Sequence, residues 1–185
     1  MLFAPPVPRR ALAWQRAAGI VAFAAFTAIA ARVTIETGGP VPFTLQVLPT
    51  LLAGIVLGWR DGALSQAVYV AAIAAGLPLD ARALGTAALA GPTAGFLVGF
   101  IPAAAVAGFI AQAGGGSVWM RWVAGVYGLF VLYVIGVPWL SISAGLPLTD
   151  AFNAVMPFLG FDLIKALIAA GLAESGRALL GQSPR

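Results

Sequence analysis

The chain has 185 residues, of which 61% are hydrophobic and 9% charged, with a net charge of +4 and a mean hydropathy of +0.99. Soluble domains carry about 25% charged residues, so this composition excludes an ordinary soluble domain and indicates a polytopic membrane protein with almost no extramembrane part. The absence of cysteine and histidine excludes disulfides, thiolate zinc sites, haem ligation by these residues and histidine-assisted nucleophiles.

Apolar stretches separated by short polar or Gly/Pro breaks predict an all-α fold, a polytopic integral membrane bundle of six transmembrane helices. A helix needs about 20 residues to cross about 30 Å of hydrocarbon, and only the second and third stretches are short. We expect a single domain over residues 1–185, with spans at roughly 17–34, 43–58, 62–78, 92–112, 122–143 and 152–174.

The first stretch follows Arg9, Arg10 and Arg16, an arrangement that superficially resembles a secretory signal. Its apolar run is longer than a signal h-region of about 7–15 residues, and five further stretches follow. We therefore expect an uncleaved first helix.

Polar groups gather between the first and second stretches, in the segment 38–46. Pro40 and Pro42 stiffen this segment, and Thr44 and Gln46 then bring polar groups to the mouth of the bundle. The alternative is an ordinary helix start with a threonine cap. Pro49 is expected to kink the second helix or to mark a break in it.

The fourth stretch opens with glycines at every fourth position, Gly91, Gly95 and Gly99. Such a face allows close approach of another helix in a membrane, so we favour packing over direct ligand contact for these residues. The preceding outer loop, which contains Asp80 and Arg82, is polar enough to cap a pocket.

The last stretch contains Asp162 and Lys165, which is the chain's only lysine. A charge in a lipid-length apolar segment costs about 2.5–3.5 kcal/mol on insertion scales, so such residues usually face the protein interior and have a function there. Their i, i+3 spacing places them on one helical face, where an acceptor beside a donor suits recognition of a small polar group. A purely structural ion pair is the alternative. A pocket at this depth would open outward, with Phe43, Tyr69 and Phe96 as candidate walls.

The arginines also predict the topology. If the N-terminus is cytoplasmic, seven arginines lie inside and two outside, a positive-inside bias that places both termini in the cytoplasm. The inner set is Arg9, Arg10, Arg16, Arg60, Arg121, Arg177 and Arg185, and the outer set is Arg32 and Arg82, with the acidic Glu36, Asp80 and Asp150.

Several blocks, taken in order, resemble one known family over about residues 20–173. They are Pro42-Phe-Thr-Leu-Gln46, Leu51-Leu-Ala-Gly54 with Leu57-Gly58, Tyr69 with Gly76-Leu-Pro78, Gly91-Pro-Thr-Ala-Gly95-Phe, and Asp162-Leu-Ile-Lys165-Ala. The chain resembles the BioY family, the biotin-specific substrate-capture (S) components of energy-coupling-factor transporters. It departs from the family where Ala94-Gly95-Phe96 stands in place of the frequent Gly-Gly-Tyr. It also departs in the loop 79–86, which is poor in the usual glycine and aromatic residues.

The resemblance implies a six-helix bundle in the cytoplasmic membrane, surrounded by lipid, with a biotin pocket near the outer face. A ureido group needs an acceptor for its N–H groups and a donor for its carbonyl. On this basis Asp162 is assigned to the ureido N–H and Lys165 to the ureido carbonyl, and contact of Lys165 with the valerate carboxylate is left open. The further implied contacts are Thr44 and Gln46 as secondary polar groups, Asp80 from the outer loop, and the aromatic residues Phe43, Tyr69 and Phe96.

The resemblance also implies partners. The sequence has no GxxxxGK[ST] motif, so concentrative uptake would need a transmembrane coupling protein and a pair of ATPase subunits. The family docks through small residues of its first helix, for which Ala18 with Ala22, or Ala24 with Ala28, have i, i+4 spacing. Whether the chain works without the ATPases, and whether it forms a homo-oligomer, is left open. No metal or cofactor is expected. No nucleic acid is expected either, since the arginines are scattered rather than clustered.

Two other classes of function compete with transport. A Ser–Lys hydrolase would use Lys165 as a base, but the neighbouring Asp162 favours the charged ammonium. A purely structural membrane subunit would leave the buried ion pair without a purpose. We rank transporter component first, structural subunit second and enzyme third, and we expect no catalytic residues.

Overall fold

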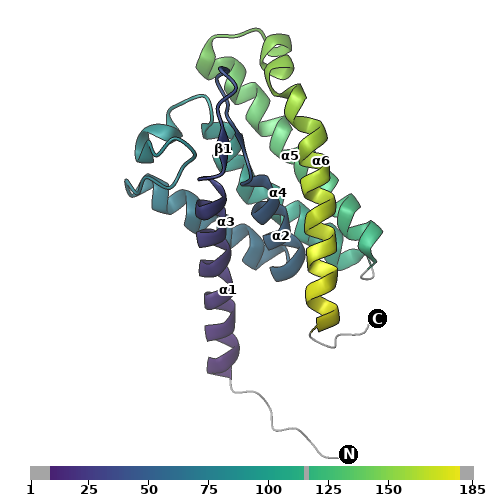
Figure 1. The fold of residues 1–185 in the computed structure, drawn as a ribbon. Helices are drawn as coiled ribbons and strands as arrows, with labels where there is room; N and C mark the ends of the chain where they lie inside the picture. Colours follow the sequence, from purple (N-terminus) through teal and green to yellow (C-terminus); the bar gives the residue numbers. More distant parts are fainter. Residues whose placement is uncertain (1–8, 115–116, 180–185) are drawn as a thin grey trace, which may run out of the picture.

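The computed structural model describes residues 9–114 and 117–179, which form six α-helices, one short 3-10 helix and a two-stranded hairpin (Figure 1). In chain order these are α1 (Arg9–Ala30), β1 (Thr34–Ile35), β2 (Phe43–Thr44), α2 (Val47–Leu57), α3 (Trp59–Ala74), η1 (Gly85–Leu89), α4 (Ala94–Ala113), α5 (Val118–Ala144) and α6 (Leu148–Leu179). The all-α membrane bundle predicted from the sequence is confirmed.

Four of these helices are long and apolar enough to cross a membrane, namely α1, α4, α5 and α6. The other two, α2 with 11 residues and α3 with 16, are shorter than the roughly 20 residues that a full crossing requires. The two helices meet at Gly58, whose φ of 84° is unfavourable for other residues and lets the chain change direction between them.

The bounds of the first two spans differ from the prediction. The first helix begins at Arg9 and ends at Ala30, because the following residues turn and enter the hairpin. The second helix begins at Val47, because Phe43 and Thr44 pair with β1 in antiparallel register. Pro49 therefore falls in the first turn of α2, where its missing N–H would have no helical partner, and the helix continues past it to Leu57.

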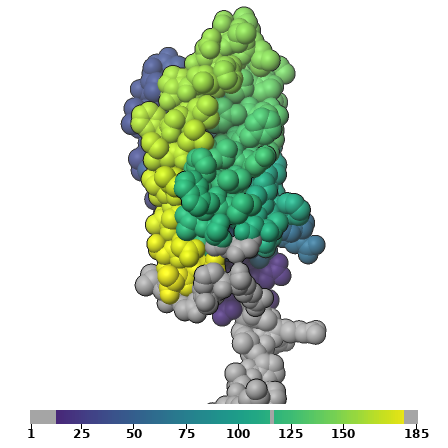
Figure 2. All heavy atoms as spheres, turned by 90° about the vertical axis from the view of Figure 1, so that its right-hand side faces the viewer, coloured from purple at the N-terminus to yellow at the C-terminus, as the bar shows by residue number. Residues whose placement is uncertain are grey.

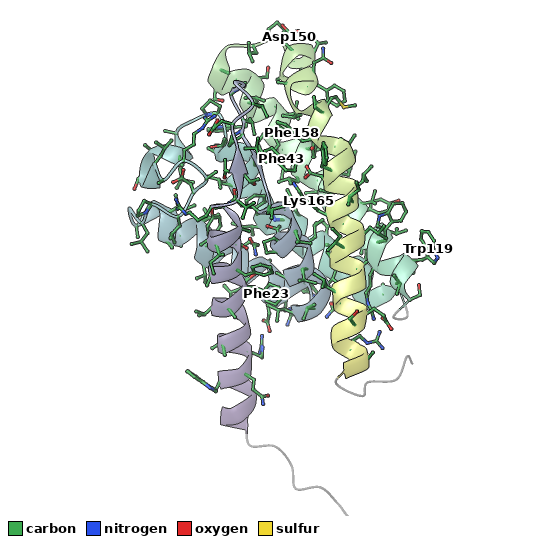
Figure 3. The ribbon with its side chains drawn as sticks, viewed as in Figure 1. Phe23, Phe43, Trp119, Asp150, Phe158 and Lys165 are labelled. Atoms are coloured by element: carbon green, nitrogen blue, oxygen red, sulfur yellow. The ribbon has the colours of Figure 1, made fainter. Side chains whose placement is uncertain are left out.

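The helix packing places α4 at the centre. It contacts α2, α3 and α5, while α6 packs on α5 and α2, and α1 lies along α3 and α2. Figure 2 shows α5 (green) and α6 (yellow) making up most of one face. The start of α1 and the end of α6 lie at the same end of the molecule (Figure 1), and Asp150, at the start of α6, marks the opposite end (Figure 3).

Glycines set the closest helix contacts. A Cβ atom on Gly95 would lie 2.3 Å from Trp139 Cβ, and one on Gly99 would lie 3.1 Å from Leu132 Cδ1, both on α5. Packing, the role favoured from their spacing, is confirmed for these two residues. Gly91 differs, since a Cβ there would meet nothing closer than 3.7 Å.

A second set of glycines, Gly54, Gly62 and Gly108, brings α2, α3 and α4 into backbone contact. A Cβ on Gly54 would lie 2.2 Å from the carbonyl oxygen of Ala104, and one on Gly108 would lie 2.5 Å from the backbone nitrogen of Trp59. Because the obstacles are backbone atoms, no side-chain rotation can make room for a larger residue. We call these three residues the glycine crossing.

Candidate substrate-binding site

A cavity lies between the hairpin, the loop before η1, and helices α4, α5 and α6. Its lining combines apolar and aromatic side chains with a few polar and charged groups, as small-molecule sites do. The lining residues are Val41, Pro42, Phe43, Thr44, Gln46, Val47, Asp80, Ala81, Arg82, Leu84, Thr93, Phe96, Leu97, Phe100, Leu132, Tyr133, Val155, Phe158, Asp162 and Lys165. Of the eight predicted site residues, the cavity brings together all except Tyr69.

Asp162 and Lys165 face this cavity from α6. Their side chains are 7% and 6% exposed, and Lys165 Nζ lies 2.7 Å from Asp162 Oδ1. The same ammonium donates to the backbone carbonyl of Thr44 at 2.6 Å and lies 3.9 Å from the centroid of the Phe43 ring. An opposite charge, a carbonyl dipole and an aromatic face together offset the cost of burying the ammonium. The expectation that the i, i+3 pair shares one interior face is confirmed.

Phe43 belongs to an aromatic wall above this pair. Its ring centroid lies 5.7 Å from that of Phe158 and 5.4 Å from that of Phe161, both on α6. Figure 3 shows Phe43 and Phe158 side by side, with Lys165 below them. Phe158 was not predicted from the sequence, although it stands four residues before Asp162 and therefore on nearly the same helical face.

The second oxygen of Asp162 has a partner that the sequence did not reveal. The Tyr133 hydroxyl of α5 donates to Asp162 Oδ2 at 2.8 Å. The Tyr133 ring meets Phe96 of α4 edge to face, at 6.2 Å and 89°. The only available signal was a polar-tipped aromatic residue inside an apolar stretch, and sequence alone does not pair α5 with α6 at that level.

Gln46 and Tyr69 form a chain of hydrogen bonds behind the cavity. Gln46 Nε2 donates to the Tyr69 hydroxyl at 2.6 Å, and that hydroxyl donates to the carbonyl of Leu79 at 3.1 Å. Thr44 Oγ1 donates to Gln46 Oε1 at 3.2 Å. Tyr69 is 1% exposed and does not line the cavity, so it holds Gln46 in place rather than forming a wall. The sequence alone does not distinguish an aromatic residue that packs in the core from one that lines a cavity.

Asp80 organises the outer loop. It is 3% exposed, and its carboxylate accepts the backbone N–H of Gly85 at 2.8 Å and that of Arg82 at 3.1 Å. Burial of a carboxylate is tolerated here because backbone donors satisfy it. Asp80 therefore shapes the loop that lines the cavity, which agrees with the expectation that this loop caps the pocket.

Arg82 joins this loop to the segment between β1 and β2. Its Nε and Nη2 atoms lie 3.0 and 2.8 Å from the two carboxylate oxygens of Glu36. The hydrogen bonds from Arg82 lower the pKa of the Glu36 carboxyl, so the pair remains charged at neutral pH. The two segments that line the outer side of the cavity are thus tied together.

The fold defines a helical integral membrane protein, and the cavity with its ion pair is a candidate small-molecule site within it. The chain belongs to the BioY family, whose model matches residues 8–182.

Several named proteins are similar to this chain. A "Biotin transporter BioY" of Rhizobium etli is 41% identical over 150 residues, covering 76% of this chain and 79% of the relative. One of Thermotoga maritima is 41% identical over 156 residues, covering 82% and 89%. A "Probable biotin transporter BioY" of Pyrococcus horikoshii is 39% identical over 157 residues, covering 84% and 91%.

A solved structure shares the fold. It is a crystal structure of the S-component for biotin from an ECF-type ABC transporter, with a TM-score of 0.84 and 22% sequence identity over 94% of this chain and 95% of that one. The family and its named relatives are transporters, which sets aside the hydrolase alternative. Within the described residues, the contacts of the Lys165 ammonium come from Asp162, Thr44 and Phe43.

Proposed function

We propose that this chain captures biotin in the cavity and serves as the substrate-binding subunit of an energy-coupling-factor transporter in the cytoplasmic membrane. The observation that carries the proposal is the Asp162–Lys165 pair, which faces a cavity in a membrane bundle. The names of relatives up to 41% identical support the choice of ligand.

The site chemistry matches the ureido group. Asp162 offers carboxylate lone pairs to the ligand's N–H groups, in addition to those used by Lys165 and Tyr133. An ammonium has three N–H donors, and Lys165 uses two of them on Asp162 and Thr44, which leaves one for the ureido carbonyl. The cavity-lining rings of Phe43, Phe96 and Phe158 provide the apolar surface for the thiophane ring.

Titration of labelled biotin into the purified protein in detergent tests this function. We expect saturable binding, weak competition by an analogue that lacks the ureido carbonyl, and strong competition by biotin amide, whose carboxylate is blocked. If biotin amide competes poorly while the first analogue competes well, Lys165 contacts the carboxylate and the assigned roles are reversed. Absence of saturable binding by the folded protein would contradict the proposed function.

The proposed orientation places both termini in the cytoplasm, because seven of nine flanking arginines then lie on that side. Reporter fusions after residues 36, 82 and 150 should report a periplasmic location, and fusions after 60, 121 and 180 a cytoplasmic one. The reverse pattern would place the cavity mouth on the wrong side for uptake and would count against the proposal.

Docking of a coupling protein and a pair of ATPases on α1 also belongs to the proposal. Ala18 and Ala22 are exposed on α1, whereas Ala24 is buried and Ala28 half-buried against the bundle. The Ala18–Ala22 face is therefore the candidate that remains free for close approach of a partner helix. Assembly as a homo-oligomer is the alternative use of the same face.

A further inference from the structure

The Asp162 carboxylate is held at both oxygens. Lys165 Nζ lies 2.7 Å from Oδ1, and the Tyr133 hydroxyl lies 2.8 Å from Oδ2. Rotation of a carboxylate about its last torsion has only broad preferences of its own, so neighbouring donors decide its plane. Lys165 lies on the same helix as Asp162, and Tyr133 is therefore the contact that sets the plane from another helix.

Tyr133 is itself held by a precise fit between α4 and α5. Its ring packs edge to face on Phe96, and the Phe96 ring lies against Gly136, one turn beyond Tyr133 on α5. A Cβ atom on Gly136 would lie 2.4 Å from both Cδ1 and Cε1 of Phe96. Any larger residue at position 136 therefore displaces the Phe96 ring, which lines the cavity and supports Tyr133.

We propose, on the basis of the proposed biotin function, that Tyr133 is a positioning residue for ligand recognition. Its hydroxyl fixes the plane of the Asp162 carboxylate, and Gly136 fixes Tyr133 through Phe96. The hydroxyl donates to one lone pair of Asp162 Oδ2, and by fixing the plane of the carboxylate it keeps the remaining lone pairs directed at ligand N–H groups. The residue acts through Asp162.

The Tyr133→Phe substitution removes only the hydroxyl and keeps the ring. We expect biotin binding to weaken at least tenfold, since the lost hydrogen bond is made to a charged group. Tyr127→Phe is the matched control, because Tyr127 lies on the same helix and is 54% exposed. It should change affinity less than twofold. Thermal unfolding of both variants checks that they fold like the wild type.

A double-mutant cycle separates positioning from general support of the fold. If Tyr133 acts through Asp162, Tyr133→Phe should change affinity less than threefold in an Asp162→Asn background. An equal loss in both backgrounds, or an affinity of Tyr133→Phe within twofold of wild type, would overturn the inference. The wild type is titrated first. If it does not bind biotin, the proposed function is wrong. If it binds biotin but the Tyr133 variants do not behave as expected, only the inference about Tyr133 is wrong.

Substitution at Gly136 tests the support for Tyr133. Gly136→Ala should weaken binding at least tenfold, because the Phe96 ring that supports Tyr133 must move away from the added Cβ atom. Gly171→Ala is the control, since a Cβ there would meet nothing within 4 Å, and it should bind like the wild type. Normal affinity of Gly136→Ala would show that Phe96 moves without disturbing Tyr133, and this part of the inference would be wrong.

Discussion

Asp162→Asn and Lys165→Met, made separately, are each expected to weaken biotin binding by about two orders of magnitude or more. Each removes a charged hydrogen bond in a desolvated site, which is worth several kcal/mol. Each also leaves the other member of the pair without its counter-ion at 2.7 Å. Breaking a buried ion pair commonly costs about 3–5 kcal/mol, so the single variants should also lose stability.

The double variant, Asp162→Asn with Lys165→Met, separates recognition from structure. No uncompensated charge remains in it, so its stability should recover relative to the single variants. Its affinity should not recover, because the amide at position 162 is a weaker, neutral acceptor than the carboxylate and the methionine at position 165 has no donor. Thermal unfolding and biotin titration of the three variants measure the two properties side by side.

Near-normal affinity in the double variant would show that the pair only holds the bundle together. The Lys165 ammonium also contacts two parts of the hairpin, the Thr44 carbonyl and the Phe43 ring. A structural pair could therefore act by anchoring the hairpin to α6. In that case Asp162→Asn and Lys165→Met would loosen the hairpin, and the site assignment would have to be abandoned.

The features predicted well are those set by local sequence. Long apolar runs establish the membrane helices, because hydrocarbon thickness dictates their length and internal hydrogen bonding dictates their form. The i, i+3 spacing of Asp162 and Lys165 likewise needs no knowledge of the fold, since a helix alone places both on one face. The glycines at 95 and 99 also revealed their packing role through spacing alone.

The features that were missed depend on contacts between distant segments. The hairpin has only two residues in each strand, too few for any alternating pattern, and the pairing of Thr34 with Thr44 spans a turn rich in glycine and proline. Tyr133 reaches Asp162 only because α5 packs on α6 at one particular height. Tyr69 was expected to line the cavity and Ala24 was a candidate for docking a partner, but both are buried in the bundle. Residue type alone does not tell which neighbour a helical face meets.

The other large effect is expected at the glycine crossing, where α2, α3 and α4 meet. Gly54→Ala would place a Cβ atom 2.2 Å from the Ala104 carbonyl oxygen, and Gly108→Ala would place one 2.7 Å from the Gly54 carbonyl oxygen. The helices must move apart, because both obstacles are backbone atoms and a close-packed interior relaxes only partly. Each substitution should cost about 3 kcal/mol, the upper end of the range for overpacking.

The loss of stability at the glycine crossing should also affect the cavity, because the helices that meet at the crossing carry residues that line the cavity. Gln46 lies at the start of α2 and Phe96 in the first turn of α4, so separation of these helices widens the cavity. The yield of monodisperse protein and the unfolding temperature in detergent measure the effect, with Gly171→Ala as the control. Alanine is a better helix former than glycine and meets nothing within 4 Å at position 171, so the control should be as stable as the wild type or slightly more so. If Gly54→Ala and Gly108→Ala unfold at the same temperature as Gly171→Ala, the three helices are not held by backbone contact, and the crossing does not determine the shape of the cavity.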